Sequence, residues 1–79
     1  MKKFPICELT TNELEIMHKF NLVDIKECNS YIEIGLRSLK GDKSLRVNYA
    51  QMVNRYLDLK VALEASNAEI TVELEKRGV

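Results

Sequence analysis

Three side chains in this sequence are of the types that carry out nucleophilic or metal chemistry, but their spacing is unsuitable for either. They are Cys7, His18 and Cys28, separated by ten and nine intervening residues. Zinc sites typically use close pairs such as C-x-x-C or H-x-x-x-H and need three or four good ligands. His18 is the only histidine, and we expect it to have a structural role on a helix. The sequence therefore predicts no metal site.

The paired carboxylates also lack the geometry of an acid–base dyad. Glu13 and Glu15 are two residues apart, as are Glu73 and Glu75, and side chains with this spacing diverge on a helix. The phosphate-binding motifs G-x-G-x-x-G and G-x-x-x-x-G-K-[ST] do not occur. We therefore predict that the protein is not an enzyme, uses no cofactor and acts by binding.

The charged residues balance overall but are unevenly distributed. Twelve basic and twelve acidic residues give zero net charge, so the molecule as a whole should not be attracted to nucleic acid or to a membrane surface. Four basic residues nevertheless cluster in the middle of the chain, namely Arg37, Lys40, Lys43 and Arg46. This basic cluster could bind phosphate or an acidic partner, so a small nucleic-acid-binding regulator is the alternative function.

The length of 79 residues predicts a single domain. A monomer of this size buries only about 60–65% of the surface that its unfolded chain exposes, so its stability would be marginal. No apolar run has the length of a signal peptide or a membrane span, and we therefore expect a cytoplasmic protein. Thiols stay reduced in that compartment, so Cys7 and Cys28 are expected to be small, partly buried hydrophobic residues.

The first half of the chain begins with a clear helix-start signal. Residues 1–9 are predicted to be an extended lead-in. Thr10-x-x-Glu13 is a capping box, in which the hydroxyl accepts from a backbone N–H and the carboxylate bonds back to the N–H of the capping residue. We expect the helix that follows to cover about 11–20.

A second, weaker capping box predicts another short helix. Asp24 and Glu27 have the same three-residue spacing, and apolar residues recur at helical intervals after them. Gly41 is a natural residue to end this helix, which we expect to cover about 25–40.

The last part of the chain is predicted to form one long helix over about 44–77, because no Gly or Pro interrupts it. Its apolar residues recur at spacings of four and three, which is typical of a coiled-coil seam. This predicted seam contains Leu45, Tyr49, Met52, Tyr56, Leu59, Leu63 and Ile70. The predicted fold is therefore all-α, with two short helices packed on one long C-terminal helix.

Alternating apolar and polar residues leave a second fold open. Residues 31–37 and 45–49 alternate in this way, which would suit an α+β fold with a β-hairpin at 31–49. Residues 70–74 alternate too, so the sequence does not decide between helix and strand at 70–75.

The segment Leu9-Thr10-Thr11-Asn12-Glu13-Leu14-Glu15-Ile16 is similar to the opening helix of some helix-turn-helix regulators, which often begin Leu-Thr-x-x-Glu. The resemblance covers only these eight residues. It stops there because the segment 20–22 contains no glycine, and because the next predicted helix carries Asp24, Glu27 and Glu33 where a recognition helix usually carries Arg, Asn or Gln.

A second stripe on the long helix supplies the main functional hypothesis. It also follows spacings of three and four, and it lies roughly 150° around the helix axis from the predicted seam. We name this set the α-stripe; it contains Val47, Ala50, Asn54, Leu57, Val61, Ala65, Ala68 and Val72. A helix with two apolar faces needs covering on both sides, by its own chain or by another molecule.

The length of the last helix favours another molecule. Thirty-odd helical residues extend about 50 Å, whereas a compact chain of 79 residues is roughly 30 Å across. We therefore predict an interface on Ala50, Asn54, Leu57, Val61, Ala65 and Ala68, most simply in an antiparallel homodimer. The predicted function is a protein–protein interaction module, a small adaptor or inhibitor of the size that phages and mobile elements encode, which binds a larger protein through a helical face.

Overall fold

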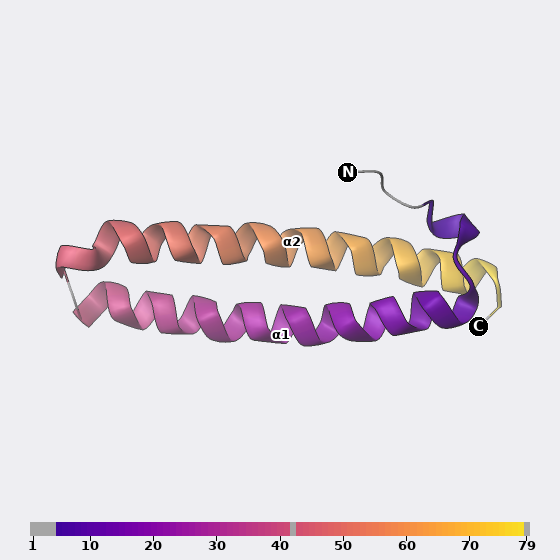
Figure 1. Cartoon of the computed structure of the whole chain (residues 1–79), viewed down its shortest axis with the longest axis horizontal. Coiled ribbons are helices and arrows are strands. Elements are labelled where there is room, and N and C mark those ends of the chain that lie inside the picture. The colour runs from indigo at the N-terminus through magenta and orange to yellow at the C-terminus, as the bar shows by residue number, and fades with distance from the viewer. Residues whose placement is uncertain (1–4, 42, 79) are drawn as a thin grey trace.

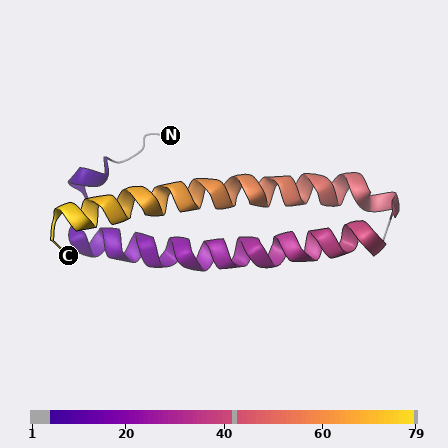
Figure 2. The same cartoon turned by 180° about the vertical axis from the view of Figure 1, so that it is seen from behind.

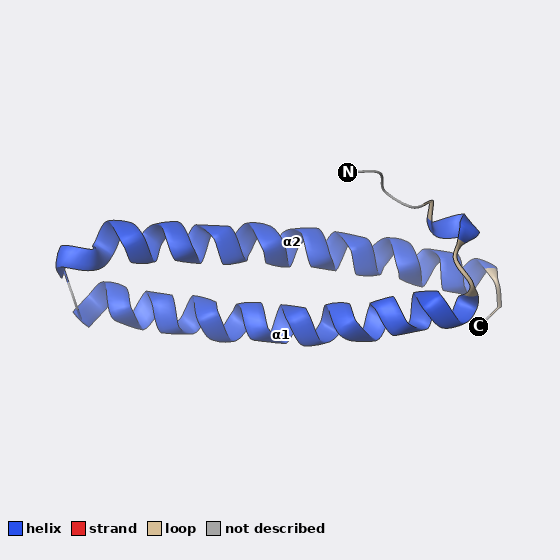
Figure 3. Cartoon of the chain, in the orientation of Figure 1, coloured by secondary structure: helices blue, strands red, loops and turns tan. Residues whose placement is uncertain are grey.

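The structure is a computed structural model that describes residues 5–41 and 43–78, and it consists of two long antiparallel helices (Figure 1). α1 (Thr11–Gly41) and α2 (Arg46–Lys76) contain 31 residues each and lie side by side along their whole length. The described residues contain no strand, as Figure 3 shows. The all-α prediction is therefore confirmed at this level.

Two single-turn 3₁₀ helices flank the long ones. η1 (Ile6–Glu8) precedes α1, and η2 (Lys43–Leu45) leads into α2. Figures 1 and 2 both place η1 beside the C-terminal end of α2, on the side that faces away from α1. The lead-in therefore contains a turn, where an extended segment was predicted.

The first half of the chain forms one helix where two were predicted, so the arrangement of two short helices on a long one is wrong. The expected break between 11–20 and 25–40 does not occur, and Asp24 lies inside α1. No Gly or Pro lies between residues 20 and 25, and packing against a partner helix stabilises an uninterrupted helix. Because α1 has no turn at 20–22, the resemblance to helix-turn-helix regulators does not extend to the fold.

The N-terminal capping box is confirmed. The backbone N–H of Thr10 donates to Glu13 Oε1 at 2.8 Å, and the N–H of Glu13 donates to Thr10 Oγ1 at 3.1 Å. Each bond satisfies a backbone donor that has no partner within the helix. At the other end, Gly41 is the last residue of α1 rather than the residue after it.

The long C-terminal helix is present, and it resolves the open alternatives. Every described residue of the segment 31–49 belongs to α1, η2 or α2, so the predicted β-hairpin is wrong. Residues 70–75 are helical as well.

One seam of residues holds α1 against α2. Most of the buried and half-buried residues recur at alternating spacings of four and three on both helices, as in an antiparallel coiled coil. On α1 they are Leu14, His18, Asn21, Ile25, Cys28, Ile32, Gly35 and Leu39. On α2 they are Tyr49, Val53, Tyr56, Lys60, Leu63, Asn67, Ile70 and Leu74.

This seam differs in part from the predicted one. Leu45 and Leu59 are 39% and 48% exposed, whereas Val53 and Asn67 are buried. The predicted set followed the large apolar side chains, and the observed set follows the face that α1 covers. Tyr56 belongs to both, and its ring stacks on Tyr31 of α1 with centroids 4.8 Å apart.

A polar layer crosses the seam one third of the way along α1. Asn21 Nδ2 donates to Asn67 Oδ1 at 2.9 Å and to Ser66 Oγ at 3.4 Å. Asn67 Nδ2 donates to the carbonyl of His18 at 3.3 Å. Since a shift of one helix along the other would separate these groups and leave amides unsatisfied in the seam, the layer favours a single register.

Arg77 closes the open end of the hairpin. Its guanidinium donates to Thr11 Oγ1 and to the carbonyl of Cys7, both at 3.3 Å, and lies 3.9 Å from the Glu73 carboxylate. One side chain therefore connects the end of α2 with the start of α1 and with η1.

The hairpin is much longer than a compact chain of the same length. Its extents are 51 × 24 × 14 Å, and its radius of gyration is 16.3 Å. A compact 79-residue chain would have a radius of gyration of about 12 Å. Two helices side by side form a single layer, so each has an outer surface that the chain does not cover.

Gly35→Ala should reduce the free energy of unfolding by about 1–2 kcal/mol. A methyl group on Gly35 would collide with Val53 Cγ2 and lie 3.0 Å from Met52 Cε, which outweighs the roughly 1 kcal/mol that alanine gains in helix propensity. Gly41→Ala is the control, because a methyl group there meets nothing within 4 Å. Urea unfolding followed by circular dichroism would compare the two, and equal stabilities would contradict close packing at Gly35.

Glu13→Gln should destabilise the protein near neutral pH and have a smaller effect in acid. The backbone N–H of Thr10, and then its hydroxyl, lower the pKa of Glu13 below its ordinary value. Such a group stabilises the fold above its unfolded pKa, about 4.3, and the contribution is lost as the pH falls through the lower folded pKa. Thermal unfolding of the wild type and the variant at several pH values would test this. A difference in melting temperature that stays constant down to about pH 3 would contradict it.

Candidate functional site

The α-stripe lies on α2 and is exposed along its whole length. Val47 and Val61 are 70% and 66% exposed, and Leu57 and Val72 are 44% and 51% exposed. The remaining four members, Ala50, Asn54, Ala65 and Ala68, are exposed too.

The geometry of a two-helix hairpin explains this exposure. The α-stripe lies roughly 135° around the axis of α2 from the seam. α1 covers only the seam face, and the described residues form no third α-helix to cover another face of α2. The six predicted interface residues are therefore brought onto one open surface.

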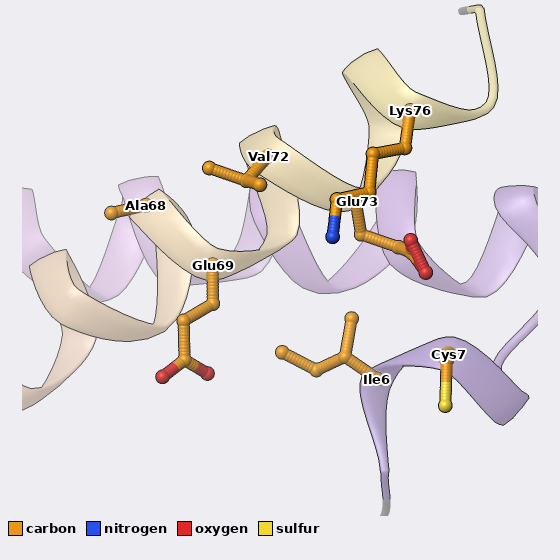
Figure 4. A pocket seen from close by; sticks show the side chains of 7 residues that line it. All are labelled: Ile6, Cys7, Ala68, Glu69, Val72, Glu73 and Lys76. Carbon is orange, nitrogen blue, oxygen red and sulfur yellow. The ribbon is translucent and has the colours of Figure 1, made fainter.

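A hollow borders the α-stripe at the C-terminal end of α2 (Figure 4). Its volume is about 440 Å³, and it lies between η1 and α2. Ile6 extends from η1 toward α2, while the thiol of Cys7 points away from it. Ala68 and Val72 of the stripe form the apolar wall, and the rim contains Glu69, Glu73 and Lys76. Sequence reasoning missed this hollow because it treated residues 1–9 as an extended lead-in.

The basic cluster lies at the closed end of the hairpin. Arg37 and Lys40 are exposed near the end of α1, Lys43 belongs to η2, and Arg46 is the first residue of α2. The reversal of the chain thus brings four cations from three elements to one end of the molecule, opposite the C-terminal end of α2 in Figure 1. Arg46 Nε donates to the carbonyl of Leu39 at 3.2 Å, which ties η2 and α2 back to α1.

A further apolar surface on α1 escaped the sequence analysis. Ile16, Phe20 and Val23 are 47%, 64% and 49% exposed and lie roughly opposite the seam on α1. We name these three residues the α1 patch. Their spacing of four and three could have revealed this patch in the sequence. The predicted helix ended at Phe20, however, and so separated Val23 from Ile16 and Phe20.

The residues considered for catalysis do not share a site. Cys7 is exposed on η1, His18 is half-buried in the seam, and Cys28 is buried. The partly buried setting predicted for both cysteines is therefore wrong for Cys7, because η1 turns its side chain outward. Within residues 5–41 and 43–78, no three His, Cys, Asp or Glu side chains form a group that could hold a metal ion.

Among the described residues, no helix is both long enough and apolar enough to cross a membrane. No protein-family model, curated protein or solved structure matches the chain.

The two thiols should differ strongly in reactivity. Cys7 is exposed and Cys28 is 2% exposed, so Ellman's reagent should modify Cys7 at once and Cys28 at least about 100-fold more slowly, through opening of the seam. Cys7→Ser should remove the fast phase alone. Two fast phases in the wild-type protein would show that the seam does not protect Cys28.

Proposed function

We propose that the protein is a non-enzymatic interaction module, an adaptor or small inhibitor that binds other proteins through the outer faces of its two helices. The α-stripe and the α1 patch are the two binding faces. Their exposure carries the proposal, because soluble monomers rarely leave long contiguous apolar surfaces in contact with water. Two faces on different helices would allow the hairpin to contact two molecules.

The energetics of the α-stripe are adequate for binding. Full burial of one Val or Leu side chain contributes about 1.5–3 kcal/mol. Val47, Leu57, Val61 and Val72 supply four such side chains in one line, separated mainly by alanines that permit close helix packing. This is the helix-in-groove type of recognition, in which apolar anchors recur at three- and four-residue intervals.

Nucleic-acid binding by the basic cluster remains the second candidate function. The observation in its favour is that Arg37, Lys40, Lys43 and Arg46 meet at one end of the hairpin. Four cations would neutralise at most a few phosphates, and binding of that kind is weak and strongly dependent on salt. Exposed lysine and arginine side chains are also commonly only solvated.

Variants on each surface should separate these functions when tagged protein captures partners from a native-host lysate. Replacing Leu57 and Val61 by Glu, or Ile16 and Phe20 by Glu, should reduce capture of the proteins that bind the altered face at least about tenfold, since each change places charge where an apolar contact is needed. Replacing Lys40, Lys43 and Arg46 by Glu should leave capture unchanged, including after nuclease treatment.

Two other results would reject the proposal. Capture that neither apolar variant changes would exclude both helical faces. Capture lost only in the basic-cluster variant, together with salt-sensitive retention of the wild type on DNA, would support the nucleic-acid function instead.

A further inference from the structure

We propose that the α-stripe binds the α-stripe of a second copy of this chain, with the two α2 helices antiparallel, so that two hairpins form a four-helix dimer. The inference rests on the proposed function and names the partner of one of its two faces. The α1 patch then stays on the outside of the dimer. Four features of the molecule support the second copy over a different protein.

The α-stripe has nearly the same pattern in both directions along α2. From the ends inward, Val47 corresponds to Val72 and Ala50 to Ala68, and Leu57 corresponds to Val61 at the centre. A two-fold symmetric interface pairs residue i with j and j with i. Antiparallel copies crossing near residues 59 and 60 would therefore place large side chains opposite large ones at both ends and at the centre. Between them, Ala50 would lie opposite Ala68, and Asn54 opposite Ala65.

The hollow beside η1 matches the most exposed member of the stripe. Val47 is 70% exposed at the N-terminal end of α2, and the hollow lies at the C-terminal end, against Ala68 and Val72. The antiparallel register brings Val47 of one copy over Val72 of the other. Its side chain would then enter the apolar space that Ile6 borders (Figure 4). Both copies would make this contact.

The charges beside the stripe favour the antiparallel direction. Arg46 and Glu75 lie on the same flank of the α-stripe at opposite ends of α2, as the helical repeat of 100° per residue requires. Antiparallel pairing brings Arg46 of one copy near Glu75 of the other, twice in the dimer. In parallel pairing Arg46 and Glu75 would lie at opposite ends of the interface and could not meet. Exposed pairs of this kind add little affinity but select orientation.

The hairpin exposes more surface than a compact monomer of the same mass would. The chain exposes 6281 Å², whereas a compact monomer of 9.1 kDa would expose about 4,900 Å². The excess of roughly 1,400 Å² per chain is within the range that obligate homodimers bury. The core inside one hairpin is correspondingly small. Among the described residues, the buried hydrophobic side chains are Leu14, Cys28, Val53 and Ile70.

Light scattering coupled to size-exclusion chromatography on the purified chain tests the dimer. We expect twice the monomer mass at micromolar concentration. Replacing Leu57 and Val61 by Glu should raise the dissociation constant at least 100-fold and give a monomer. A matched variant with Ile16 and Phe20 replaced by Glu should remain dimeric. A wild-type chain that stays monomeric from micromolar to near-millimolar concentration would overturn the proposal.

Cysteine cross-linking tests the register and does not depend on the folding of a charged variant. In a Cys7→Ser background, Val47→Cys and Val72→Cys are made in separate chains, which are mixed and oxidised. We expect a covalent dimer in the mixture and not in either chain alone. Asn48→Cys is the control for Val47→Cys. It lies at almost the same position along the helix axis, but its side chain points about 100° away from the α-stripe and therefore away from the partner. Cross-linking of Val47→Cys to itself would show parallel pairing and overturn the antiparallel arrangement.

The dimer and the broader function fail in different ways. A monomeric chain whose capture of host proteins is lost when Leu57 and Val61 are replaced would reject the second copy and leave the interaction module standing. A cross-linked dimer whose capture of host proteins is unaffected by both apolar variants would support the dimer and reject the binding of other proteins.

Discussion

The contact between α1 and α2 along a single seam is the constraint on which the rest of this molecule depends. Each helix has 31 residues, and most of the stability of a helix in a protein comes from packing of its apolar face. Residues at alternating spacings of four and three are buried along both helices, and this contact keeps each helix continuous. The seam also determines what is left outside it. A pair of helices has only one mutual face, so any second apolar stripe must face solvent or another molecule.

The composition of the seam limits how tightly and in which register the helices pack. Gly35 allows close approach to Val53 near the closed end, and the Asn21–Asn67 layer forms hydrogen bonds that a shifted pairing would break. Apolar side chains in these positions would bury more area but specify the alignment less well. Arg77 completes the arrangement at the open end by holding η1 against α2, which creates the hollow beside the α-stripe.

The binding surfaces follow from this single-layer construction. The α-stripe and the α1 patch are exposed because the described residues form no third α-helix that could cover them. The near-symmetric pattern of the stripe, the hollow and the flanking charges together suit a second hairpin in the opposite direction. The basic cluster at the closed end is a consequence of chain reversal, and it is positioned away from the central residues of the stripe, Leu57 and Val61.

Local signals in the sequence determined the helical class, the capping box at Thr10 and Glu13, and the two-sided pattern of the C-terminal helix. Those features depend on neighbouring residues and on helical periodicity, which a sequence shows directly. Tertiary structure alone decided that α1 continues past Asp24, because the capping signal there is weaker than the free energy gained by packing an unbroken helix on α2. It also decided that Val53 and Asn67 rather than Leu45 and Leu59 face the seam, and that Ile6 turns back to form the hollow. Each of these depends on contacts between segments far apart in the chain, such as Gly35 with Val53 and Asn21 with Asn67.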